Sequence, residues 1–108
     1  IDRKKEMIIV GGYNVFPRDV EEILYMHPAI AEAAVIGKAD DRLGEVIVAF
    51  IATKPEQKLS EEDFFDYCKE NMVKYKRPVA VNFVDALPRT GARKINKLAL
   101  KEKIKLHK

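Results

Sequence analysis

The chain has 108 residues, of which 47% are hydrophobic and 34% charged, with five Gly and five Pro. This is the size and composition of one globular domain, and it excludes a disordered or low-complexity protein. The single cysteine, Cys68, excludes an internal disulfide and a thiolate zinc cluster, and with two His we expect no protein-only metal site. The longest apolar run, at 46–52, is far shorter than the ~18 residues of a membrane span, and the charged residues 2–6 are unlike a signal peptide. We therefore expect a cytoplasmic protein with no transmembrane segment.

The net charge of +3 hides two oppositely charged parts. Residues 74–108 contain eleven Lys or Arg and two acidic residues, whereas residues 1–73 contain nine basic and fifteen acidic residues. A basic end on an acidic body indicates an anionic partner. Nucleic acid, a phosphorylated cofactor and a membrane surface all remain candidates on charge alone.

The first elements form a hairpin, a helix and two long strands. Apolar runs at 7–10 and 13–16 flank Gly11 and Gly12, which predicts a tight β-hairpin. Pro17 is well placed at the first position of a helix that ends at His27 and Pro28. Two strands follow, at 31–37 and 45–53, around the polar turn 39–44. The second strand is almost entirely apolar, so we expect it in the middle of a sheet covered on both faces.

The second half of the chain predicts a helix, a strand and a final helix. Ser60 is the expected N-cap, with Asp63 three residues later. One face of this helix carries Phe64, Tyr67, Cys68, Met72 and Tyr75. Arg77 and Pro78 end it, a strand follows at 79–84, a polar loop lies at 88–94, and a lysine-rich helix runs over 96–106 with Leu100 and Ile104 facing inward. The predicted fold is α+β: a separate N-terminal hairpin, then a small, mostly antiparallel three-stranded sheet packed by three helices.

Most residues that could carry chemistry have a structural explanation. Cys68 lies on the apolar helix face, which favours core packing. His27 favours a helix-end role, and the acidic stretch 61–66 is typical of a solvated helix start. Lys94 lies in the polar loop and is either a solvated lysine or a group that stabilises negative charge on a polyanion held by another domain. The residue types alone leave this choice open.

Six short motifs follow one another along the chain. They are DRKKEMII at 2–9, GGYNVFP at 11–17, VEE at 20–22, HPAIAEAAV at 27–35, YKRP at 75–78 and LPRT at 87–90. In this order and at these separations they resemble the small C-terminal domain of adenylate-forming enzymes, particularly fatty-acyl-CoA synthetases. The resemblance covers essentially the whole chain. It departs from the family pattern at Ala92 and Arg93, where a hydroxyl residue and Gly are usual, and at Asp2, where Gly is usual.

The resemblance implies that residues 1–108 are the C-terminal lid of an acyl-CoA synthetase, with a hinge at 1–6, the hairpin at 7–16 and an α+β body at 17–108. The N-terminal ATP-binding domain would lie outside this chain, and the first residue, Ile1, also leads us to expect a piece of a longer polypeptide. The implied partners are that adenylation domain and the substrates ATP, CoA and a fatty acid. Mg²⁺ is expected to enter with ATP and not to be ligated by this domain.

The implied reaction has two steps, between which the lid rotates. A carboxylate and ATP give an acyl-adenylate and pyrophosphate, and the thiol of CoA then displaces AMP. The resemblance makes Lys94 the catalytic lysine of the first step, Lys5 the hinge and Arg3 a nucleotide contact. It places Gly11, Gly12 and Tyr13 at the CoA channel. Charge adds four candidate phosphate contacts: Arg77, Arg89, Arg93 and Lys97.

Two alternatives stay open. The basic C-terminal part could make the chain a stand-alone nucleic-acid-binding module. Against this, Phe64, Tyr67 and Tyr75 are expected in the core, which leaves no surface platform on which bases could stack. A related adenylating enzyme that hands its acyl group to a carrier-protein arm would have the same lid.

Overall fold

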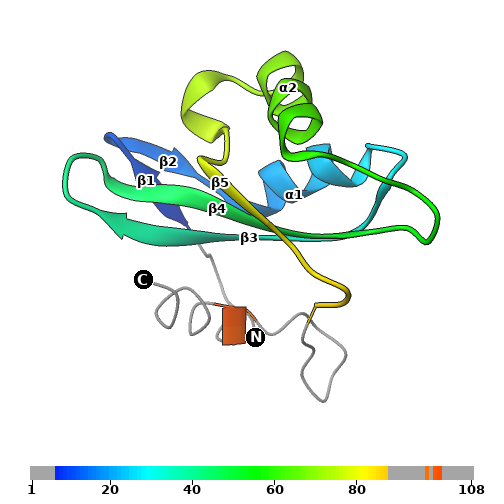
Figure 1. The fold of residues 1–108 in the computed structure, drawn as a ribbon. Helices are drawn as coiled ribbons and strands as arrows, with labels where there is room; N and C mark the ends of the chain where they lie inside the picture. Colours follow the sequence, from blue (N-terminus) through cyan, green and yellow to red (C-terminus); the bar gives the residue numbers. More distant parts are fainter. Residues whose placement is uncertain (1–6, 88–96, 98, 101–108) are drawn as a thin grey trace.

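A single mixed sheet organises the computed structural model, which describes residues 7–87, 97, 99 and 100. In chain order the strands are β1 (Ile8–Val10), β2 (Tyr13–Val15), β3 (Ile30–Asp40), β4 (Gly44–Thr53) and β5 (Ala80–Phe83). The helices are α1 (Pro17–Tyr25), α2 (Glu61–Asn71) and the short 3₁₀ helix η1 (Lys74–Lys76). The strand order is β2-β1-β4-β3, and β5 pairs with β4 (Figure 1).

The long antiparallel pair β3–β4 is the frame of the sheet, and its register runs from Ile30↔Thr53 to Asp40↔Gly44. Oδ2 of Asp40 accepts the backbone N–H groups of Arg42 and Leu43 at 3.1 and 2.9 Å, which closes the turn between the two strands. Since β3 occupies one edge of β4, the other edge takes both β1, at Gly44, and the parallel strand β5, at residues 48–51.

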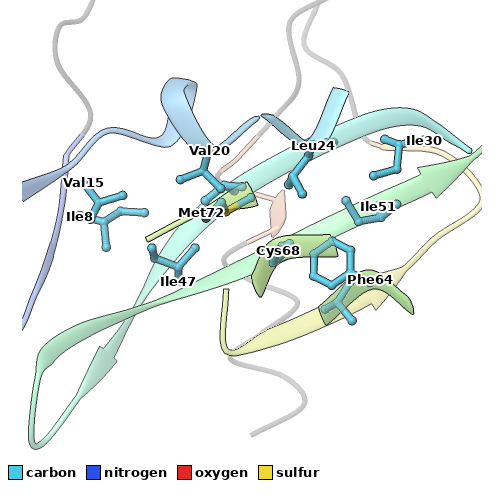
Figure 2. Close-up of a cluster of buried hydrophobic side chains, with 14 residues drawn as sticks. Ile8, Val15, Val20, Leu24, Ile30, Ile47, Ile51, Phe64, Cys68 and Met72 are labelled. Carbon is cyan, nitrogen blue, oxygen red and sulfur yellow. The ribbon is translucent and has the colours of Figure 1, made fainter. Parts of the chain in front are cut away.

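Apolar cores lie on both faces of the sheet, as the apolar sequence of β4 predicts, and α1 and α2 cover one of these faces (Figure 1). Ile47, Ala49 and Ile51 belong to a core on one face, under the hairpin, α1 and α2. Figure 2 shows this core, in which Val20 and Leu24 of α1 meet Phe64 and Cys68 of α2 above the sheet. Alternate residues of β4 point the other way, as strand geometry requires. The second core contains Ala34, Ile36, Val48, Phe50, Leu87 and Leu100.

The two helices begin as their sequences predict. Pro17 is the first residue of α1, where its missing N–H costs nothing. The Ser60 side chain accepts the N–H of Asp63 at 3.0 Å and so caps α2. Each helix buries one apolar face, and the free energy for docking comes from that burial, at about 1.5–3 kcal/mol for each fully buried large side chain.

The α+β class and the mostly antiparallel sheet are confirmed, with three corrections of detail. The hairpin is not separate, because Val10 pairs with Gly44 and joins it to the sheet. The sheet therefore has five strands and not three. The helix α2 ends at Asn71, so Tyr75 lies on η1 and not on the apolar face of α2. Of the predicted final helix, Lys97, Ala99 and Leu100 are described and helical, with Leu100 fully buried as expected, and the remainder lies outside the described residues.

Candidate functional site: the hairpin turn and its supports

The turn of the N-terminal hairpin presents bare backbone. Ile8, Ile9 and Val10 pair with Val15, Asn14 and Tyr13, which leaves Gly11 and Gly12 as the two turn residues. Their φ angles are +56° and +88°, in the left-handed region that favours glycine and that this type of hairpin turn requires. A β-carbon added at Gly12 would meet nothing within 4 Å, so a ligand can approach the peptide backbone there closely.

The base of the turn is fixed to the β3–β4 turn. The N–H of Gly11 donates to the carbonyl of Leu43 at 2.8 Å. The N–H of Ile9 donates to Oε1 of Glu45 at 2.9 Å, although Ile9 and Glu45 are not paired in the sheet. β1 and β4 are paired at Val10 and Gly44, and the Glu45 carboxylate supplies the acceptor for the N–H of the preceding residue of β1, Ile9.

Tyr13, the residue after the two glycines, stacks on Tyr75 of η1. Their ring centroids lie 4.2 Å apart and their planes differ by 12°. Tyr13 is 56% exposed and Tyr75 partly buried, so the pair lies at the surface beside the turn. Lys74 and Lys76 flank Tyr75 in the chain. The structure therefore brings together two segments 62 positions apart in the sequence, the hairpin turn and the start of the YKRP motif.

Arg77 joins η1 to the end of α2. Its Nε donates to the carbonyl of Met72 at 3.0 Å and its Nη2 to the carbonyl of Lys69 at 3.1 Å. A guanidinium is suited to this double contact because its N–H groups form a planar fork, and a cation is favourable at a helix C-terminus. Arg77 was predicted as a phosphate contact, and that role stays a prediction beside the structural one found here.

Lys97, the other described candidate for a phosphate contact, is paired with Glu21. Its Nζ lies 2.7 Å from Oε2 of Glu21, and both side chains are about four-fifths buried, with 20% and 19% of their surface exposed. The same Oε2 accepts the N–H of Val35 at 2.9 Å. Glu21 thereby ties α1 to the edge of β3 and to the segment that covers the opposite face of the sheet.

The remaining sequence-predicted site residues lie outside the described residues. They are Arg3, Lys5, Arg89, Arg93 and Lys94. The structure thus describes the CoA-channel candidates Gly11, Gly12 and Tyr13 and two of the four phosphate candidates. Among the described residues, no group of three or more His, Cys, Asp or Glu could hold a metal ion. No helix within the described part of the chain is long and apolar enough to cross a membrane.

The buried thiol of Cys68 is a core group. Only 1% of the residue is exposed, and burial raises the pKa of its thiol to about 12, against a smaller lowering by the charge of Arg77. Neutral pH therefore leaves Cys68 protonated and unreactive. Burial, with a smaller contribution from Cys68, also raises the pKa of Tyr67, whose O–H donates to the carbonyl of Ile23 at 2.7 Å. The core-packing prediction for Cys68 is confirmed.

His27 likewise has the expected helix-end role. Its Nδ1 accepts the N–H of Ala29 at 3.0 Å, and its ring meets that of Tyr67 edge-on with centroids 4.8 Å apart. The hydrogen bond holds the chain just after α1, and the ring contact ties this end of α1 to α2.

Sequence reasoning did not find Glu45, the carbonyl of Leu43 or the partnership of Tyr75 with Tyr13. Glu45 gave one signal, since it is a lone charge at the start of an otherwise apolar strand. The role of the Leu43 carbonyl depends on how the strands pair, and the stack of Tyr75 on Tyr13 depends on where α2 ends. The pattern of neighbouring residues specifies neither of these. Phe64 is buried and Tyr67 and Tyr75 pack, partly buried, against the same core, as expected, whereas Tyr13 adds a ring that stacks on Tyr75 at the surface.

Comparison with known proteins agrees with this arrangement. A family model described as the AMP-binding enzyme C-terminal domain matches residues 19–94. The ligase named "3-[(3aS,4S,7aS)-7a-methyl-1,5-dioxo-octahydro-1H-inden-4-yl]propanoyl:CoA ligase" from Rhodococcus jostii is 45% identical over 104 residues, which are 96% of this chain and 20% of that protein. The residues matched by the family model contain four of the six motifs, from VEE at 20–22 to LPRT at 87–90.

Solved structures give the same result. The o-succinylbenzoate CoA synthetase from Bacillus subtilis, solved with its acyl-adenylate intermediate, has a TM-score of 0.84 and 40% identity over 93% of this chain and 20% of that one. An acyl-CoA synthetase from Brucella canis has a TM-score of 0.88 and 31% identity over 100% of this chain and 21% of its own. The chain spans about a fifth of the length of these relatives. It belongs to the family of AMP-binding enzyme C-terminal domains.

Proposed function

We propose that this domain is the mobile lid of an AMP-forming acid–CoA ligase. The observation that carries the proposal is the family match over residues 19–94, together with relatives that are named as CoA ligases. In the first step, a carboxylate oxygen attacks the α-phosphorus of ATP, the bond to pyrophosphate breaks and an acyl-adenylate forms. In the second step, the sulfur of CoA attacks the acyl carbon, AMP leaves with the bonding electrons and the thiol proton is released.

Lys94 is proposed to act in the first step. An ammonium beside the reacting carboxylate and phosphate oxygens stabilises the negative charge that is redistributed as pyrophosphate leaves. Arg3 is proposed to contact the nucleotide and Lys5 to be the hinge about which the lid turns. The neighbouring adenylation domain of the same polypeptide is proposed to hold ATP, with Mg²⁺ on its phosphates, and the acid.

The hairpin turn is proposed to act in the second step. Once the lid has turned, Gly11 and Gly12 would line the path of the pantetheine arm of CoA. Support comes from the open space around Gly12, where a β-carbon would meet no atom within 4 Å. A carrier-protein arm ends in the same pantetheine group, so the turn alone does not separate the two acceptors.

The acid is proposed as a class, a carboxylic acid with an apolar body. The names of the relatives specify a propanoate on a bicyclic dioxo-octahydroindene and an o-succinylbenzoate, each of which is built on a carbon ring. A fatty acid, the expectation from the sequence, is proposed as the member of this class that the protein uses. The substrate pocket itself is proposed to lie in the adenylation domain.

Full-length protein tests the proposal directly. Carboxylate-dependent exchange of pyrophosphate into ATP and formation of the acyl-CoA thioester are measured with a panel of fatty, aromatic and bicyclic acids. The proposal predicts exchange with at least one acid and thioester formation only when CoA is added. Acyl transfer to a carrier protein but not to CoA would change the acceptor, and no exchange with any acid would contradict the proposed function.

A further inference from the structure

Tyr75 is well placed to hold the hairpin turn in one orientation. β1 and β2 have three residues each, and a two-stranded ribbon of this length has little stability of its own. At its base the hairpin is held by the bonds from Ile9 to Glu45 and from Gly11 to Leu43, and by the fully buried Val15. All these contacts involve β1, the first turn residue or the far end of β2. Tyr13 is paired with Val10 inside the hairpin, but these contacts do not tie the Gly12–Tyr13 end of the turn to the rest of the domain, so that tie must come from another contact.

The stack on Tyr75 supplies that contact. Nearly parallel rings with centroids 4.2 Å apart restrict both the distance and the tilt of Tyr13. Because Tyr13 directly follows Gly12, the stack also restricts the peptide plane of the bare turn. Tyr75 itself has a firm support, since Arg77 bonds two carbonyls at the end of α2. Arg77 is the C-cap of η1 and holds this short helix against the end of α2, and Tyr75 of η1 in turn stacks on Tyr13.

We propose that Tyr75 is a positioning residue for thioester formation, which acts through Tyr13 on the hairpin turn. This inference rests on the proposed function and deepens it. Displacement of reacting groups by as little as 1 Å can lower a rate about a hundredfold, so a turn free to tilt would guide the thiol of CoA poorly. Adenylation uses the other orientation of the lid, in which the hairpin turn does not guide CoA, so its rate does not depend on the position of the turn.

The test uses the full-length protein and measures the two half-reactions separately. Tyr75→Ala is expected to lower the rate of thioester formation from supplied acyl-adenylate about tenfold or more, while pyrophosphate exchange stays within about twofold of the unsubstituted protein. Retained exchange also shows that the variant is folded. Tyr75→Phe keeps the stack and is expected to restore thioester formation. Tyr25→Ala removes an exposed tyrosine from α1 and is the matched control with no expected effect.

A double-substitution cycle separates positioning from a direct role of Tyr75. If Tyr75 acts through Tyr13, adding Tyr75→Ala to Tyr13→Ala changes the rate of thioester formation by less than about twofold. The inference is overturned if the two effects multiply, if Tyr75→Ala slows both half-reactions equally, or if it slows neither. Failure of the unsubstituted protein to form any acyl-adenylate would overturn the proposed function instead, and this is visible before any variant is made.

Discussion

Gly37 lies beneath the carboxylate of Glu45, and a β-carbon added at Gly37 would lie 2.9 Å from Oε2 of Glu45 and 3.2 Å from two side-chain carbons of Ile8. The same carboxylate accepts the N–H of Ile9 through Oε1. The absence of a side chain at Gly37 therefore makes room for the group that joins the hairpin to the sheet. A glycine in β3 is thus explained by close approach and not by a turn.

Gly37→Ala is predicted to destabilise the domain by about 1–3 kcal/mol, because the methyl group displaces both Glu45 and the buried Ile8. Urea unfolding of the 108-residue chain measures this loss. On a Glu45→Ala background the same substitution is expected to cost less, since the nearest obstacle is gone. Equal costs on the two backgrounds would show that Glu45 does not occupy the space above Gly37.

Loss of the ion pair between Lys97 and Glu21 is predicted to lower stability. Lys97→Met leaves the carboxylate of Glu21 with the N–H of Val35 but without its cation, and we expect a loss of about 1–2 kcal/mol, since the pair is largely shielded from water. Lys54→Met removes an exposed lysine and is the control, with an expected change below about 0.5 kcal/mol. If both variants unfold at the same urea concentration, Lys97 has no structural role.

Arg77 is predicted to stabilise the end of α2. Arg77→Met removes two charge-assisted hydrogen bonds, to Met72 and Lys69, and should cost about 1.5–3 kcal/mol. Arg77→Lys should recover little of this, because an ammonium lacks the planar fork that reaches both carbonyls. Thermal unfolding measures the stability of both Arg77 variants, with Arg18→Met, at an exposed position of α1, as the control. Full recovery with Lys would mean that charge alone, and not the two hydrogen bonds, is what matters.

Alkaline pH is predicted to destabilise the domain through Cys68. The pKa of the thiol is about 12 in the folded state and near 9 in the unfolded chain. Between these values the unfolded chain loses the proton while the folded protein keeps it, so the free energy of unfolding is unaffected below about pH 9 and falls as pH rises toward 12. In that window the thiol contributes a fall of up to about 1.4 kcal/mol per pH unit. Cys68→Ala should have a shallower alkaline slope between pH 9 and 11, and identical slopes would contradict the assignment.

The sequence predicted the elements well because each carries a local physical signal. The two turn glycines specify the hairpin, Pro17 and Ser60 specify the helix starts, and the apolar run of β4 specifies a central strand, all of which the structure confirms. These signals depend on backbone conformation and burial within a few residues.

What the sequence did not predict depends on contacts between distant segments. The α2 helix was expected to continue to Tyr75, since the helical spacing of apolar residues persists to that point. Instead the backbone becomes extended at Met72, whose carbonyl accepts a hydrogen bond from the side chain of Arg77. That early end is what turns Tyr75 toward Tyr13. Lys97 was assigned to phosphate because its charge was visible in the sequence, whereas its pairing with Glu21 was not.

The most direct test of the proposed function is the effect of Lys94→Ala on the two half-reactions of the full-length protein. The proposed role of Lys94 predicts that carboxylate-dependent pyrophosphate exchange falls by about a hundredfold or more, as expected for removal of a group that stabilises charge in the transition state. Thioester formation from supplied acyl-adenylate and CoA should be retained. Equal loss of both half-reactions, or full retention of exchange, would contradict it.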